Sequence, residues 1–392
     1  MNTRLCRLSV ELSKSGPMKN CGCGVITVME APRCDPTALA PLVPGERFIR
    51  SVQLGGGLFN QLWTLLGLVF QAAERKLPFV LPTFDSHISP HSMGIRSTEA
   101  NLPRSVPFAE LFDVNCLVGA LHTHGIAAHE QPPAHFRKTA ALSLKPNELF
   151  LSYKRYVENR SRDEAGPAPL EDVVYRALRP SARLLAHARA FIRASAALRS
   201  PRGYGCVHAR IENDMRRWWY HVGKVKPVTM AEILRLLDSI DDVRTTPSLF
   251  VAVGSDLRRS DEELLRGERT PWNGSMVRRR SASDDRSGRL VADAGSSSPS
   301  SSTLSYVESA VVDFAICRAA TWFAGWSSSS FSASLAHIRH LDRPVDRYYA
   351  YCGAMPALRR SAMITLQPPA DTVRIHTCKL RNRTVKSQAG RA

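Results

Sequence analysis

The sequence that decides the fold is RFIRSVQLGGGLFNQLWTLLGLVFQAAERKLPFVL at residues 47–81. Residues 48–54 have the mixed alternation of a short strand, and three glycines turn the chain after it. Residues 58–73 then carry apolar side chains at spacings of three and four, the stripe of an amphipathic helix. A second strand is predicted at 77–81, before Pro82. Strand, helix and strand in this order form a βαβ unit, which predicts a parallel sheet.

A second series of strands and helices begins near residue 204. The pattern predicts strands at 204–208, 248–253 and 322–325, with helices at 229–240, 256–266, 305–320 and 327–339. A helical region at 171–198, interrupted by Pro180, connects the two series. We therefore expect an α/β protein with two Rossmann-like domains facing a cleft.

Neither end of the chain is predicted to belong to one of the two domains. We expect a poorly ordered leader at 1–46, an N-terminal domain at 47–198, a C-terminal domain at 199–345 and a tail at 346–392. Residues 270–302 are polar and rich in serine and arginine, which predicts a disordered insertion in the second domain.

Composition narrows the class of protein. With 44% hydrophobic and 22% charged residues the chain is typical of globular proteins, and no apolar run reaches the ~18 residues of a membrane-spanning helix. The formal net charge of +18 indicates either polyanionic partners or an arginine-rich solvated surface. Nucleic acid is an unexpected partner because no basic run is interleaved with aromatic residues. Residues 1–44 lack the apolar core of a signal peptide.

Cysteine and histidine patterns do not predict a metal site. Nine cysteines include no CxxC pair, and Cys206 and Cys317 lie in apolar patterns that predict buried thiols. The loop histidines His122, His124 and His129 have no acidic partner at a useful spacing, so we interpret them as solvated. Sequons at Asn159, Asn273 and Asn382 favour a secretory location only weakly.

The first candidate site is the glycine turn before the helix. Gly56 and Gly57 let the backbone approach a ligand, and the helix start presents free N–H groups to negative charge. Asn60 and Gln61, on the first turn, could hydrogen-bond that ligand. The alternative is a tight turn with a solvated amide on the helix.

The second candidate site is the end of the strand at 204–208. His208 and Arg210 point to the same side of an extended chain, where the carboxyl end of a strand can face a ligand. The planar fork of Arg210 suits a diphosphate. The alternative is an ion pair between Arg210 and Glu212 or Asp214.

The third candidate site precedes the last predicted helix. The hydroxyls and amides of Ser329 and Ser330, followed by Phe331, can hold phosphate, or the serines can simply cap the helix. Asp313, among apolar neighbours, is either a satisfied core carboxylate or a nucleoside contact.

In order and spacing these segments resemble the GDP-fucose protein O-fucosyltransferase family, in particular its plant/algal-like branch. The motifs are GGGLFNQ at 55–61, VPFAELFDV at 106–114, HARIENDM at 208–215, VVD at 311–313 and SSFS at 329–332. The resemblance covers about 47–339. The α-1,2 and α-1,6 fucosyltransferases share the glycine and asparagine start, but Ile211 stands where they usually carry a second arginine.

The resemblance implies a GT-B-like fold and an inverting, metal-independent transfer of fucose from GDP-fucose, without a cofactor, to a protein Ser/Thr hydroxyl or a glycan. It places the acceptor in the N-terminal domain, GDP-fucose in the C-terminal domain and the enzyme in the secretory pathway. Arg210 would grip the diphosphate, and Asn60 would lie near the reacting sugar. The implied nucleotide contacts are Gly56, Gly57, His208, Asp313, Ser329, Ser330 and Phe331.

Two questions stay open at the level of sequence. Glu212 and Asp214 are both candidates for a catalytic base, and either could instead orient Arg210. The high arginine content also allows a catalytically silent member of the family, or a basic scaffold that binds polyanions.

Overall fold

The computed structural model describes residues 47–51, 54, 57–85, 105–130, 141–159, 170–213, 228–254, 257–267, 272–279, 304–326, 329–343, 347–351 and 373–374. All of them belong to one compact unit, Pro32–Ala392. The predicted leader at 1–46 lies outside the described residues.

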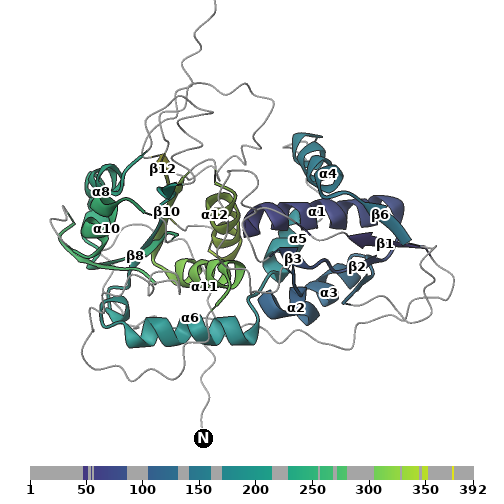
Figure 1. The fold of residues 1–392 in the computed structure, drawn as a ribbon, viewed down its shortest axis with the longest axis horizontal. Helices are drawn as coiled ribbons and strands as arrows, with labels where there is room; N and C mark the ends of the chain where they lie inside the picture. The colour runs from purple at the N-terminus through teal and green to yellow at the C-terminus, as the bar shows by residue number, and fades with distance from the viewer. Residues whose placement is uncertain are drawn as a thin grey trace, which may run out of the picture. The chain divides into compact units, whose positions relative to one another are not determined.

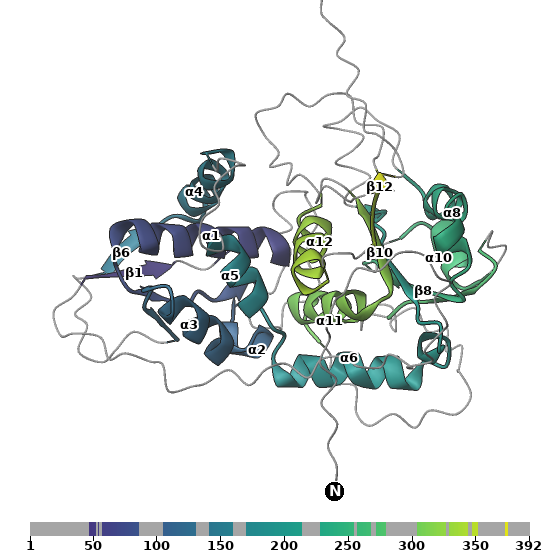
Figure 2. The same ribbon diagram turned by 180° about the vertical axis from the view of Figure 1, so that it is seen from behind.

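The first sheet is parallel, in the strand order β5-β2-β1-β6. Its predicted βαβ unit is confirmed, because β1, α1 and β2 follow one another and β1 pairs with β2 in parallel. The buried face of α1 packs against this sheet, and α4 lies beside α1 (Figures 1 and 2). The elements are β1 (Phe48–Ser51), α1 (Leu58–Arg75), β2 (Phe79–Val80), β5 (Ala128–His129), β6 (Ala141–Leu144) and α4 (Pro146–Asn159).

Between these elements, the described residues within 82–146 form structure that the sequence did not predict. A small antiparallel pair, β3 (Phe84–Asp85) and β4 (Ser105–Val106), is followed by α2 (Phe108–Leu111) and α3 (Val114–His122). The predicted helical region at 171–198 is confirmed, with its break at Pro180. It consists of α5 (Leu170–Ala177), α6 (Ala182–Ala194) and the 3-10 turn η4 (Ala197–Arg199).

The second sheet has six parallel strands in the order β12-β11-β10-β7-β8-β9. Numbered along the chain from β7, this is the 3-2-1-4-5-6 order of Rossmann-like sheets, with the change of direction between β7 and β10. The strands are β7 (Gly205–His208), β8 (Ser248–Ala252), β9 (Ser275–Val277), β10 (Trp322–Trp326), β11 (Arg347–Tyr351) and β12 (Val373–Arg374). Both sheets are therefore of the α/β class that the sequence predicted, with the parallel order that a GT-B-like architecture requires.

Helices cover both faces of this sheet because alternate strand residues point to opposite sides. Cys206, Phe250 and Phe323 pack toward the core that includes α11 and α12, whereas Val207 and Leu249 pack toward α8 and α10. Figure 1 shows these helix pairs on opposite sides of β8 and β10. The helices are α8 (Met230–Asp238), α9 (Asp241–Arg244), α10 (Arg259–Leu265), α11 (Tyr306–Ala319) and α12 (Ser330–Asp342).

Two predicted boundaries are wrong in part. The insertion at 270–302 begins with an ordered segment, because β9 pairs with β8 through Met276 and Val277. The tail at 346–392 begins with β11, whose aromatic residues Tyr348 and Tyr349 are buried beside β10. In both places pairing with a neighbouring strand outweighs local composition. Among the described residues, no helix is long and apolar enough to cross a membrane.

Candidate functional site

The central feature of the site is the carboxyl end of β7, next to the point where the strand order reverses. Open α/β sheets bind ligands at such a point because the connections diverge there. The second motif lies here, since β7 ends at His208 and Arg210 follows two residues later. The third motif follows the neighbouring strand, since β10 ends at Trp326 and α12 begins at Ser330.

A tyrosine from another strand fixes the backbone of the second motif. The Tyr351 hydroxyl donates to the carbonyl of His208 at 2.6 Å and accepts from the backbone N–H of Arg210 at 3.1 Å. Tyr351 lies on β11, two strands from β7, and it is buried. Burial raises the pKa of Tyr351, so its hydroxyl stays protonated and remains a donor.

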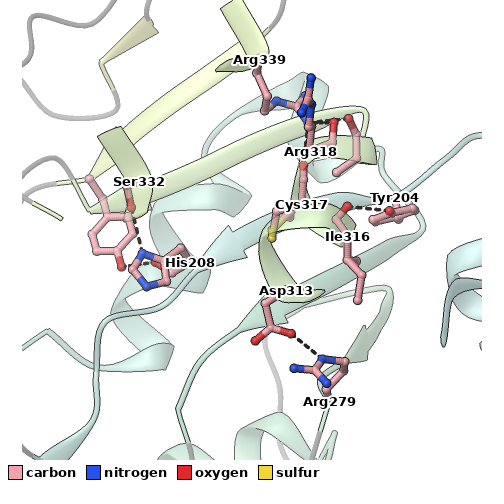
Figure 3. Close-up of a disulfide and its surroundings, with 12 residues drawn as sticks. Tyr204, His208, Arg279, Asp313, Ile316, Cys317, Arg318, Ser332 and Arg339 are labelled. Atoms are coloured by element: carbon pink, nitrogen blue, oxygen red, sulfur yellow. Dashed lines mark hydrogen bonds and ion pairs between the residues drawn. A yellow bond between two sulfur atoms is a disulfide. The ribbon is translucent and has the colours of Figure 1, made fainter. Parts of the chain in front are cut away.

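His208 is a buried, neutral imidazole rather than a cation. Its Nδ1 is hydrogen-bonded to the Ser332 hydroxyl at 2.9 Å (Figure 3), and its ring stacks on Phe331 with the centroids 4.3 Å apart. Burial lowers the pKa of His208 to about 3, and the nearby charge of Arg210 acts in the same direction. The ring can therefore hydrogen-bond and stack, but it adds no charge to a phosphate site.

Arg210 is held by a carboxylate. Its Nη1 lies 3.1 Å from Oε2 of Glu212, and the two side chains are 24% and 9% exposed. The other oxygen of Glu212 accepts the backbone N–H of Gly254 at 2.8 Å. The ion pair that was the alternative for Arg210 is therefore present, and it fixes the guanidinium at the sheet edge while part of it faces solvent. Asp214 lies outside the described residues.

Phe59, the aromatic residue of the glycine motif, packs beside the residues that surround His208. Phe59 packs against Phe331, with the ring centroids 4.7 Å apart, and against Phe314 at 5.0 Å. Gly57 precedes α1 and Asn60 is exposed on its first turn. Gly56 lies outside the described residues.

The prediction that Gln61 could contact a ligand is wrong, because Gln61, the last residue of this motif, has a structural role. It is fully buried, and its amide exchanges two hydrogen bonds with the backbone of Asp85, at 3.1 and 2.8 Å. These bonds fasten the start of α1 to β3.

The serine motif combines a buried and a partly exposed serine. Ser329 is 8% exposed and makes no capping hydrogen bond through its side chain among the described residues, so simple capping does not explain it. Ser330 is half-buried at the first turn of α12. The fully buried Ser332, which the sequence analysis missed as a functional residue, is the one that contacts His208.

Asp313 is paired with Arg279, which lies in the predicted insertion. Nε of Arg279 donates to Oδ1 of Asp313 at 2.6 Å, and its Nη2 donates to the carbonyl of Ser309 at 2.8 Å. Figure 3 shows the two side chains pointing toward each other. Burial raises the pKa of Asp313, and the charge of Arg279 opposes that rise.

A disulfide connects β7 to α11. Cys206 and Cys317 are bonded, with their Cα atoms 5.2 Å apart, so the prediction of two free thiols is wrong although both residues are buried. An odd count of nine cysteines gave no sign of this pair. Cys116 is also disulfide-bonded.

The loop histidines do not form a metal centre. His122 and His124 are exposed at the end of α3, as predicted, whereas His129 is half-buried on β5, where burial lowers its pKa. Across the described ranges, no three His, Cys, Asp or Glu side chains gather as metal ligands. The absence of a metal requirement stays a prediction.

The comparisons with known proteins give one kind of match. No protein-family model and no curated protein sequence matches the chain. Similar solved structures include POFUT1 in complex with GDP-fucose, at 16% identity and a TM-score of 0.46 over 80% of this chain and 99% of that one. Fucosyltransferase NodZ from Bradyrhizobium is 14% identical, with a TM-score of 0.40 over 76% and 93% of the two chains.

At such identities and TM-scores, the likeness to these structures assigns neither a family nor an activity to the chain. Three functional candidates were missed by the sequence analysis: Tyr351, Ser332 and Arg279. Only the alternation of aromatic residues around Tyr351, typical of a buried strand, could have signalled one of them.

Proposed function

We propose that this protein transfers fucose from GDP-fucose to a hydroxyl group of a protein or a glycan. The observation that supports it is the meeting of three separate motifs at the reversal point of the second sheet. Phe331 stacks on His208 and also contacts Phe59, so residues from the glycine, histidine and serine motifs lie in one cluster. The motif resemblance predicts that these three segments bind one ligand.

In this proposal Arg210 stabilises the departing diphosphate. An acceptor hydroxyl attacks the anomeric carbon from the side opposite to GDP, the carbon–oxygen bond to the diphosphate breaks, and negative charge develops on the leaving group. Because Glu212 already orients the guanidinium of Arg210, this group can stabilise the developing charge without reorganising during the reaction. Such preorganisation is what makes electrostatic catalysis effective. The N–H groups at the start of α12, with Ser329 and Ser330, add donors for phosphate.

Other residues have supporting roles. Asn60, exposed on the first turn of α1, is proposed to contact the reacting sugar. Glu212 is already bonded to Arg210 and to Gly254, so we assign it to orientation and leave Asp214 as the candidate base. The reaction is proposed to invert the anomeric centre and to need no metal, so an excess of chelator should leave the rate unchanged.

The location proposed for the protein is the lumen of the secretory pathway. The Cys206–Cys317 disulfide supports it, because such bonds persist in oxidising compartments and are rare in the cytosol.

The proposal is tested by measuring GDP and GDP-fucose binding by calorimetry, with transfer rates for Arg210→Lys. Lysine keeps the charge but loses the two-pronged fork, so turnover should fall on the order of 10²–10³-fold, more than ground-state binding. Arg318→Lys is the matched control, since Arg318 pairs with Asp342 at the far end of α11. Folded protein that binds no GDP at millimolar concentration would disprove the function. A less stable Arg210→Lys variant with the parental rate would show that Arg210 is structural.

A further inference from the structure

The Arg279–Asp313 pair presents a donor and an acceptor side by side. Asp313 uses Oδ1 for Arg279, and Arg279 uses Nε and Nη2 for Asp313 and Ser309. Among the described residues, neither Oδ2 of Asp313 nor Nη1 of Arg279 has a further partner. Both side chains keep some exposure, 14% for Arg279 and 17% for Asp313. The pair can therefore still bind a group that offers both an acceptor and a donor.

The disulfide places Asp313 at the ligand edge of the sheet. The C-terminal end of α11 lies at the start of β7, where Tyr204 donates to the carbonyl of Ile316 (Figure 3), so α11 runs opposite to β7. From the Cys206–Cys317 bond, Asp313 is one helical turn away, about 6 Å toward the carboxyl edge. His208 is two strand residues away in the same direction, about 6.6 Å. Asp313 and His208 therefore lie at similar distances from the disulfide along the direction toward the carboxyl edge of the sheet.

We propose that Arg279 acts with Asp313 to read the base of the bound nucleotide and to select guanine over adenine. The inference rests on the proposed function, which supplies a nucleoside contact at Asp313, and adds Arg279 as the residue that determines specificity. Guanine presents the acceptor O6 beside the donors N1–H and N2–H₂, whereas adenine presents a donor, N6–H₂, beside the acceptor N1. An arginine donor beside a carboxylate acceptor matches guanine and opposes adenine.

Arg279 also keeps Asp313 suitable for this task. A carboxylate that accepts two donors must be ionised, and a protonated one would become a donor itself. Burial favours the protonated form of Asp313 and the charge of Arg279 disfavours it, so the arginine maintains the acceptor as well as donating to O6. Loss of Arg279 therefore removes one contact and weakens the other.

The test compares GDP, IDP and ADP binding by calorimetry for the parent and for Arg279→Met, which keeps an unbranched apolar stem but removes the guanidinium and its charge. Affinity for GDP should fall about 10- to 100-fold, the range for losing a charged hydrogen bond. Affinity for IDP should fall by the same factor because inosine keeps O6 and N1–H. Affinity for ADP should change little, so the GDP to ADP ratio shrinks. Arg318→Met, which breaks another arginine–carboxylate pair on α11, should leave the ratio unchanged.

Arg279→Lys is the second variant, because it keeps a positive charge beside Asp313 if the methionine variant does not fold. One ammonium group replaces the fork, so the ratio should again shrink while the melting temperature stays near the parental value. If the parent binds GDP but Arg279→Lys or Arg279→Met changes GDP and ADP affinities equally, or changes neither, the inference is wrong and the proposed function stands. A parent that binds no GDP at all overturns both.

Discussion

His208 illustrates how the surroundings of one residue decide its chemistry. The sequence places a histidine and an arginine on the same side of a strand end, which resembles a pair of cations. Packing against Phe331 and a hydrogen bond to Ser332 keep the imidazole buried and neutral, so of these two residues only Arg210 is a cation. The neutral ring can hold the aromatic cluster in place while the guanidinium of Arg210 supplies the charge.

This state of His208 predicts a stability that depends on pH. The unfolded histidine takes up a proton near its usual pKa of 6.5, whereas the folded one does so only near about 3. Between these values the unfolded state binds more protons, so the free energy of unfolding falls as pH decreases from about 6.5. Denaturant titrations at pH 7, 6, 5 and 4 should therefore show a shallower decline for His208→Gln than for the parent. The exposed His122→Gln is the control, and equal declines for parent and His208→Gln would contradict the burial argument.

At the scale of elements, α1 owes its position to a glycine in its middle. A Cβ built on Gly67 would lie 1.8 Å from the carbonyl oxygen of Leu149, on α4. The two helices can therefore approach closely only because Gly67 has no side chain. This contact holds α1, and with it Phe59 and Asn60 at its start, in relation to the first sheet.

Substitution of Gly67 by alanine should destabilise the protein although alanine is the better helix former. The gain of up to ~1 kcal/mol in helix propensity is outweighed by overpacking against the α4 backbone, for a net loss of about 1–3 kcal/mol. Gly57→Ala is the matched control, because a Cβ there meets nothing within 4 Å. Chemical denaturation of both variants measures the difference. If Gly67→Ala were as stable as Gly57→Ala, α4 would be able to shift away from α1 without a loss of stability.

At the scale of the whole molecule, the sequence predicted the regular α/β elements and the places where motifs follow strands. Periodicity of apolar residues and glycine turns are local signals, so α1, β7 and Arg210 could be located from them. Arg279, Tyr351 and the Cys206–Cys317 bond could not, because each depends on pairing between distant segments. A Ser/Arg-rich composition concealed the ordered strand that carries Arg279 to Asp313.

We expect the Cys206–Cys317 disulfide to stabilise the whole molecule. Cys206 and Cys317 are 111 residues apart, and cross-linking so long a loop restricts the unfolded chain strongly. The double variant Cys206→Ala, Cys317→Ala should lose about 2–5 kcal/mol of unfolding free energy. It should also bind GDP more weakly, because His208 and Asp313 are no longer held in register. Urea denaturation and calorimetry measure these effects, and a double variant as stable as the parent would show that the bond is dispensable.

The same separation sets an order of events during synthesis. At ~5–20 residues per second, the ribosome needs roughly 5–20 s to advance from Cys206 to Cys317. Throughout that interval β7 can pair with β8 but has no β10 beside it, and Cys206 can react only with cysteines made earlier, such as Cys116. Any such early bond must be exchanged once Cys317 emerges. The edge that carries His208 and Arg210 is therefore completed late, after Cys317 and β10 have been synthesised.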